Sequence, residues 1–374
     1  MTTHVFIVDD KTFKCHLEYM FVGTGAKDKI VDFNEAAETK LHYSSENGLV
    51  GMIADLSRVR VGDFVIFYLL QNSSHEGKFF GIFKIANVPF IDGNGAYLDT
   101  NLEKKLTFRC LIEPFEVYAD GVSEWEALDE IRGIDSPSQM LWSLIYRKLK
   151  GNRGNTMITI YEAERLFQLL KSKNSHKKMS IANGLSFQDG QLVQGVTYTY
   201  SGTQTPVSIL PRLITKYKAN KAFESHLQAY ITQFVDDKRK TLQPLLIGEH
   251  ILEWIGNEVS CGVGMQRIDI MLSLSESIEK KVVIPIELKA VPYYLGITNQ
   301  LQRYVDWLEQ YYIPNRPSII SPVIITKKGS LVSMSKIKQE LDNFNVKNTN
   351  CLPVKLIEFE VNANNTDLIF TRSI

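Results

Sequence analysis

The stretch from residue 265 to 308 constrains the fold of this chain more than any other. It holds two apolar runs with the composition of β-strands, and these runs carry Asp269 and Glu287. Alternate residues of a strand share a face, so Glu287 and Lys289 are predicted to point the same way. Asp269 joins them if the two strands are neighbours. Two carboxylates and one ammonium are groups that can support metal-assisted hydrolysis of a phosphodiester.

Strands and helices alternate around this stretch. Residues 219–234 carry apolar side chains at helical spacing, and a second helical pattern covers residues 296–311. The predicted order after it is strand, helix, strand, at residues 318–326, 335–343 and 354–360. This alternation predicts an α/β core with a mixed sheet.

Length and composition limit the remaining choices. A chain of 374 residues is longer than most single domains, so two domains are expected. Its 42 basic and 42 acidic residues balance, so a nucleic-acid partner would have to bind a local basic patch. Four widely separated cysteines predict a reducing, cytoplasmic location. Neither a leader nor an apolar run of membrane-spanning length is recognisable, so no membrane partner is expected.

The first 172 residues are predicted to form a small barrel-like sheet with helices, giving an α+β domain. Residues 61–70 and 78–86 are rich in β-branched and aromatic side chains and flank a polar turn, which predicts a hairpin. Thr159 and Glu162 have the spacing of a capping box at the start of a helix.

The predicted domain boundaries follow from a change in composition. Residues 173–215 begin with a basic, polar run typical of an exposed linker and continue into a hairpin with an Asp-Gly turn. Residues 216–374 then form the domain that carries the acidic residues.

Two segments of the first domain resemble the EVE and PUA-like family, nucleic-acid-binding barrels related in fold to the YTH readers of methylated bases. They are residues 60–68 followed by 81–85, and then residues 151–166 with an Arg-Gly turn that enters a helix. The resemblance implies an aromatic pocket for a flipped or single-stranded base, because every base has a face to stack and an edge to read. The candidate pocket and phosphate-contact residues are Tyr68, Trp125, Trp142 and Arg153. Core positions for the aromatics and a capping role for Arg153 are the alternatives.

Residues 220–326 resemble the PD-(D/E)XK nuclease superfamily, and most closely its RecB-like branch, which includes an archaeal and bacterial endonuclease family that cuts at mismatches and DNA structures. The match rests on Arg-Ile-Asp, Glu-Leu-Lys and a later Gln-x-x-x-Tyr. Ile268 stands where the family often has a proline. The resemblance implies a restriction-endonuclease-like core with the catalytic residues Asp269, Glu287, Lys289, Glu224, Gln300 and Tyr304.

The roles implied by that resemblance define a metal-dependent nuclease. Asp269 and Glu287 would hold Mg²⁺, with Mn²⁺ as an alternative, and Lys289 would orient the water or the phosphate. Glu224 is the acid on the preceding helix. Arg267 is a candidate contact to the nucleic acid, or else a partner of Glu258.

The two resemblances together predict a Mg²⁺-dependent DNA endonuclease, most simply a modification-dependent restriction enzyme. Its first domain would recognise a flipped or modified base in double-stranded DNA, and its second would hydrolyse the phosphodiester. A non-catalytic reader with a decayed nuclease core, and a structure-directed or RNA-directed nuclease, are the alternatives. Whether two chains pair as a homodimer is left open.

Overall fold

The computed structural model describes the chain apart from residues 26–45, 93–96, 131, 146–153, 182, 222, 263–265, 277–279, 314–317 and 330, and apart from the side chains of 46–48. The described residues form two compact units. Unit 1 comprises residues up to 207 except 136–138, and unit 2 comprises those three residues and residues 208–374. No helix in this described part is both long and apolar enough to cross a membrane.

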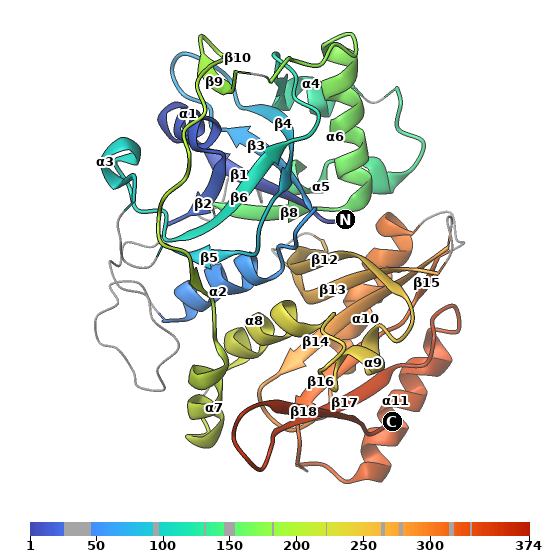
Figure 1. Ribbon diagram of the computed structural model, residues 1–374. Helices are drawn as coiled ribbons and strands as arrows, with labels where there is room; N and C mark the ends of the chain where they lie inside the picture. The colour runs from blue at the N-terminus through green and yellow to red at the C-terminus, as the bar shows by residue number, and fades with distance from the viewer. Residues whose placement is uncertain are drawn as a thin grey trace. The chain divides into compact units, whose positions relative to one another are not determined.

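Unit 1 is built on a curled sheet of nine strands (Figure 1). The strands are β1 (Thr3–Val8), β2 (Phe21–Thr24), β3 (Phe64–Leu69), β4 (Lys78–Ile85), β5 (Phe90–Ile91), β6 (Phe108–Pro114), β7 (Val122–Ser123), β8 (Asn155–Ile158) and β11 (Thr205–Pro206). The main path runs β11-β5-β6-β4-β3-β1-β8, with β1 parallel to β3. β3 and β4 pair antiparallel, which confirms the predicted hairpin.

Six helices are described in the first 207 residues, and three of the six begin with a side-chain cap. They are α1 (Asp10–Tyr19), α2 (Glu46–Ser57), α3 (Asp99–Leu102), α4 (Glu124–Asp129), α5 (Trp142–Ile145) and α6 (Ile160–Lys173). The N–H of Thr12 donates to Asp9 Oδ1 at 2.7 Å, and this bond caps α1. The predicted capping box of Thr159 and Glu162 is present at α6. α5 follows a short 3₁₀ turn at Pro137–Gln139.

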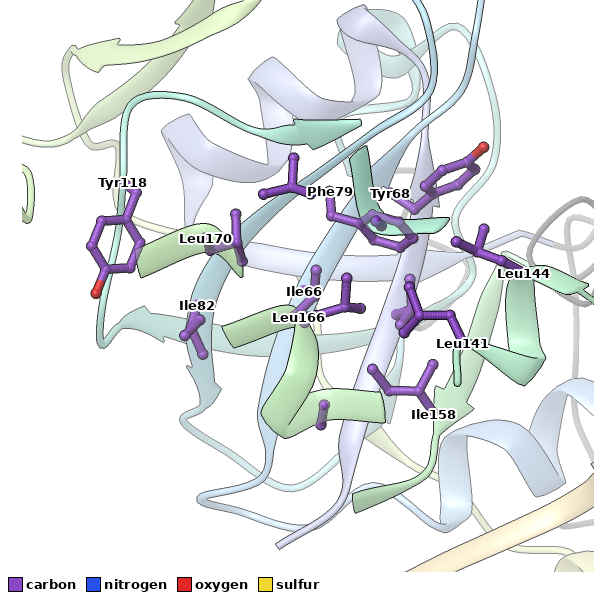
Figure 2. Close-up of a cluster of buried hydrophobic side chains, with 14 residues drawn as sticks. Ile66, Tyr68, Phe79, Ile82, Tyr118, Leu141, Leu144, Ile158, Leu166 and Leu170 are labelled. Carbon is purple, nitrogen blue, oxygen red and sulfur yellow. The ribbon is translucent and has the colours of Figure 1, made fainter. Parts of the chain in front are cut away.

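The sheet of unit 1 is covered on both faces, because residues of β3 alternate between them. Ile66 and Tyr68 lie in a buried cluster with Leu166 and Leu170 of α6 (Figure 2). Phe67 faces the other way and packs against Phe13 of α1, with 4.9 Å between ring centroids. The two helices therefore bury opposite faces of one hairpin.

The hairpin predicted around an Asp-Gly turn is formed by β9 (Leu185–Gln188) and β10 (Gln191–Gln194). Asp189 and Gly190 both have positive φ, 50° and 79°, as the primed turns of tight hairpins require. This hairpin belongs to unit 1, and β9 packs against α1.

Unit 2 is built on a seven-stranded mixed sheet, as the alternating pattern predicted (Figure 1). Its strands are β12 (Ile251–Ser260), β13 (Arg267–Ser275), β14 (Lys281–Lys289), β15 (Ile319–Ile320), β16 (Val323–Lys327), β17 (Lys355–Val361) and β18 (Leu368–Arg372). β12, β13 and β14 run antiparallel, β16 and β17 continue parallel to β14, and β18 closes the edge antiparallel to β17.

The helices of unit 2 are α7 (Leu210–Lys218), α8 (Glu224–Phe234), α9 (Gln243–Leu246), α10 (Thr298–Trp307) and α11 (Met334–Lys347), with a π-helical turn, η3 (Leu308–Tyr312), after α10. The helix expected from residue 219 begins only at Glu224. α8 packs against β12, β13 and β14, and α10 packs against β14 and α11. Both helices therefore approach the strand that carries the Glu-Leu-Lys triplet.

Pro285 lies inside β14, although proline has no N–H to donate to a β-ladder. The pairing of β13 with β14 runs in unbroken register through Met271 and Pro285. On the other side of β14, β15 pairs at residues 282 and 283, and β16 pairs from residue 286 onward. The proline therefore falls in the gap between two parallel partners, where no ladder donor is required.

Candidate active site

The two predicted metal ligands lie on adjacent strands. β13 and β14 are antiparallel with Ile270 opposite Ile286, which brings Asp269 and Glu287 side by side. The N–H of Leu288 donates to Asp269 Oδ2 at 2.8 Å. The backbone of β14 thus holds the carboxylate of Asp269, which lies on β13. Asp269 and Glu287 are neighbours, as the sequence predicted.

Glu287 is fully buried and has a contact at each carboxylate oxygen. Lys289 Nζ lies 2.5 Å from Oε1, and the hydroxyl of Tyr304 donates to Oε2 at 2.6 Å. Burial lowers the pKa of Lys289, but the charges of Glu287, Glu224 and Asp269 outweigh it and raise that pKa overall. Burial, with the charges of Asp269 and Glu287, also raises the pKa of Tyr304. The lysine keeps its charge and the tyrosine keeps its proton at neutral pH.

The start of α8 adds a third carboxylate. Glu224 Oε1 lies 3.9 Å from Lys289 Nζ. Burial is the main cause that raises the pKa of Glu224; the charge of Lys289 opposes it and that of Glu287 adds to it. One turn later, Gln228 Nε2 donates to the backbone oxygen of Asp269 at 2.8 Å. Gln228 was not anticipated, although its i+4 spacing from Glu224 was a usable signal.

The charges of this cluster suit a divalent cation. Glu224, Asp269 and Glu287 bring three negative charges when ionised, against the single positive charge of Lys289. Burial, together with the charge of Glu287, raises the pKa of Asp269 well above its usual range. Mg²⁺ prefers carboxylate oxygens and would offset this excess, with Asp269 and Glu287 as its ligands. Among the described residues, no three acidic, histidine or cysteine side chains are arranged closely enough to hold a metal ion. One carboxylate oxygen of Glu287 is in contact with Lys289 Nζ.

Tyr304 gives a first prediction about this cluster. Tyr304→Phe removes the donor to Glu287 Oε2 and leaves a buried carboxylate oxygen unsatisfied, so we expect a loss of about 1–3 kcal/mol in the free energy of unfolding. Urea denaturation measures it. Tyr294→Phe, which removes the hydroxyl of a partly exposed ring in the same unit, is the matched control. Equal stability of the two variants would contradict the expectation.

Gln300 and Arg267 lie at the edge of the cluster. Gln300 is half-buried on α10, one turn before Tyr304, and no described contact joins it to the acids. Arg267 Nη1 lies 2.9 Å from Glu258 Oε2, which is the ion-pair alternative raised by the sequence. Glu258 adopts a φ of 53°, unusual for a residue within a strand, and sits between the residues of β12 that pair with Ile268 and Ile270.

The candidate residues of unit 1 are not gathered into an open aromatic pocket. Tyr68 is 1% exposed within the core, and its hydroxyl donates to Glu124. Stacking a base on its ring would require that core to open. Trp142 is half-buried at the start of α5, and Arg153 lies outside the described residues.

Trp125 is the exposed aromatic among these candidates, at 63%. It lines a pocket of about 680 Å³ on α4 and α6. The charged residues of the lining are Glu76, Glu126, Asp129, Glu130 and Lys173. Such an acidic rim opposes a phosphate backbone, so the pocket suits the face of a base better than its phosphate.

The site and fold define an α+β protein whose second mixed sheet carries an acid, acid, lysine cluster. No protein-family model matches the sequence, and no curated protein matches it. Several solved structures are similar to part of the chain. One is a hypothetical protein from Leishmania major, with 11% identity and a TM-score of 0.30 over 46% of this chain and 96% of that one.

A second similar structure is the human THYN1 protein in complex with DNA containing 5-methylcytosine, with 9% identity and a TM-score of 0.28 over 46% of this chain and 98% of that one. A third is a protein from Pseudomonas syringae, with 12% identity and a TM-score of 0.26 over 45% and 98%. At such identities and scores the likeness carries no argument about ligand or activity, and the two family resemblances stay predictions.

Proposed function

We propose that unit 2 hydrolyses phosphodiester bonds of DNA with a divalent cation, and that unit 1 directs it by recognising a flipped or modified base. The observation that supports the first part most is the contact of Lys289 and Tyr304 with the two oxygens of Glu287, beside Asp269. Four residues from two strands and a helix converge, and each has a use in cutting a phosphodiester.

The roles of these residues follow from their contacts. Bound Mg²⁺ or Mn²⁺ supplies polarisation of the phosphate and an acidified water. Asp269 and Glu287 would hold that ion, the first oriented by Leu288 and the second by Tyr304. Lys289, whose pKa is raised, would hold the attacking water or stabilise charge that develops on the phosphate.

The role of unit 1 rests on the sequence resemblance and on the exposure of Trp125. A base outside its stack could lie on that ring, because any base offers a π face. Selection by base modification followed by cutting would make the chain a modification-dependent restriction enzyme.

One observation favours a second candidate function. Lys289 Nζ lies 2.5 Å from Oε1 of Glu287, so the charge of this buried acid is already partly neutralised without a metal ion. A protein that reads nucleic acid without cutting it needs no metal ion at this place, and the contact of Lys289 with Glu287 is compatible with such a protein. Activity in the presence of a divalent ion separates the two candidates.

The proposal predicts that cleavage requires both a divalent ion and Glu287. Duplexes with and without modified bases are incubated with Mg²⁺ or Mn²⁺ and resolved on a denaturing gel. We expect cleavage that EDTA abolishes and that Glu287→Gln lowers by roughly 10²-fold or more. Glu276→Gln, at an exposed residue paired with Lys280, is the control and should cut normally. Intact DNA under every divalent ion would leave only the reading function.

A further inference from the structure

The loop between β14 and α10, residues 290–297, exposes apolar side chains beside the site. Val291 is 47% exposed, Tyr294 37% and Leu295 50%. Single exposed apolar side chains are normal on a protein surface, but exposed apolar side chains that adjoin one another often mark a binding site. Three of them within five residues form a small apolar surface, which we name the 291–295 surface.

The loop is anchored at both ends. Tyr293 is buried under it, and the oxygen of Val291 accepts from the N–H of Lys327 at 3.2 Å. The N–H of Gly296 and the hydroxyl of Thr298 both donate to Glu340 Oε1, at 3.0 and 2.7 Å. The exposed side chains are thus presented by a fixed backbone, and a fixed surface loses little entropy when it binds.

The 291–295 surface adjoins the catalytic cluster. The backbone N–H of Ala290 donates to the Glu224 carboxylate, which lies 3.9 Å from Lys289 Nζ. Two residues of trans backbone span at most about 7.6 Å, which sets the largest distance between the Cα atoms of Lys289 and Val291. The other end of the loop leads into α10, which carries Tyr304. A nucleic acid whose phosphate meets Lys289 would therefore pass its sugar and base over this loop.

We propose that the 291–295 surface stacks on the base of the nucleotide next to the scissile phosphate, so that the preferred substrate holds an unpaired or unstacked base at that place. This inference rests on the proposed function. In a regular duplex both faces of a base are covered by its neighbours, and only an unstacked base offers a face. One ring flanked by aliphatic groups complements that face. A protein partner fits poorly, because a specific interface buries about 1,200–2,000 Å² and three side chains supply a small part of that.

Fluorescence of 2-aminopurine tests the proposal. The base analogue is placed in a single-nucleotide bulge and, separately, in a fully paired duplex, with Ca²⁺ replacing Mg²⁺ to slow cutting. We expect the wild-type chain to bind the bulged duplex roughly ten-fold tighter and to quench its fluorescence, since stacking on protein side chains has about this effect on affinity. The double variant Tyr294→Ala, Leu295→Ala should lose both the preference and the quenching.

Val346→Ala is the matched control, because Val346 is 77% exposed on α11 of the same unit. It should keep the preference, and equal unfolding midpoints establish that the double variant is folded. If the double variant still prefers the bulged duplex, the proposal is overturned. It is also overturned if the double variant loses self-association in sedimentation while its binding to DNA is unchanged, because the surface would then be a contact between two copies of the chain. Cleavage of both duplexes at equal rates overturns the proposal and leaves the nuclease standing. Quenching without cleavage in Mg²⁺ or Mn²⁺ overturns the nuclease and leaves base stacking on the 291–295 surface standing. Failure to bind either duplex overturns both the stacking and the nuclease.

Discussion

Replacing Lys289 by methionine is expected to lower the single-turnover rate of DNA cleavage by on the order of 10²–10³-fold, which is the usual cost of removing one group that stabilises charge in a transition state. Methionine keeps the length of the side chain and removes its charge. Lys289 Nζ lies 2.5 Å from Glu287 Oε1 and 3.9 Å from Glu224 Oε1, so its loss also removes the positive charge among three acids. DNA affinity should change only a few-fold, because one phosphate contact among several is lost.

The control for this variant is Lys280→Met. Lys280 pairs with the exposed Glu276 in the same unit and lies outside the cluster. Because Lys289→Met leaves a buried acid without its cation, thermal unfolding must establish that the variant is folded at the assay temperature. Cleavage by Lys289→Met within three-fold of the wild-type rate would show that the ammonium has no part in the reaction.

The strands of the site could be predicted because their pattern is local. β13 and β14 are nearly continuous apolar runs, and Glu287 and Lys289 share a face because alternate residues of any strand do so. The capping box at Thr159 is equally local, since its residues lie three apart. In these two cases the signal is a spacing within one element, and sequence and structure agree.

The missed features depend on contacts between distant residues. Gln228 matters because α8 crosses β13; its i+4 spacing from Glu224 places both residues on one face of the helix, but does not show what that face contacts. Tyr68 lies near the end of a strand, where the sequence allows either a pocket or a core position. Glu124 accepts a hydrogen bond from its hydroxyl, which allows the ring to be buried in the core. The exposure of Tyr294 depends on the burial of its neighbour Tyr293, and two adjacent tyrosines give no sign of which one faces inward.

Asp269→Asn is expected to stabilise the ligand-free protein while abolishing cleavage. Burial and the charge of Glu287 raise the pKa of Asp269 above its usual 3.8 in the folded state. As pH rises through the window between these two values, the unfolded chain releases this proton while the folded chain keeps it. Folding stability therefore falls across that window, and the loss persists at higher pH.

Asparagine carries no charge at any pH and can still accept from the N–H of Leu288. At pH 7 the variant should therefore gain on the order of 1 kcal/mol, which corresponds to a rise of roughly 2–4 °C in unfolding midpoint. The difference from wild type should shrink as the pH is lowered toward 4. Asp342→Asn, at an exposed position of α11, should show neither the gain nor its pH dependence.

Added Mg²⁺ should reverse this order, because a cation held by Asp269 and Glu287 binds the folded state alone and stabilises it by mass action. The wild-type midpoint should rise with Mg²⁺ concentration, more steeply at higher pH where Asp269 is ionised, and the Asp269→Asn midpoint should stay flat. A lower midpoint for Asp269→Asn without metal would mean that its charge stabilises the fold. Equal responses of both proteins to Mg²⁺ would mean that the ion binds elsewhere. The expected pair of results would identify Asp269 as a residue that costs stability in the free protein and contributes it when the metal is bound, which a purely structural ion pair would not do.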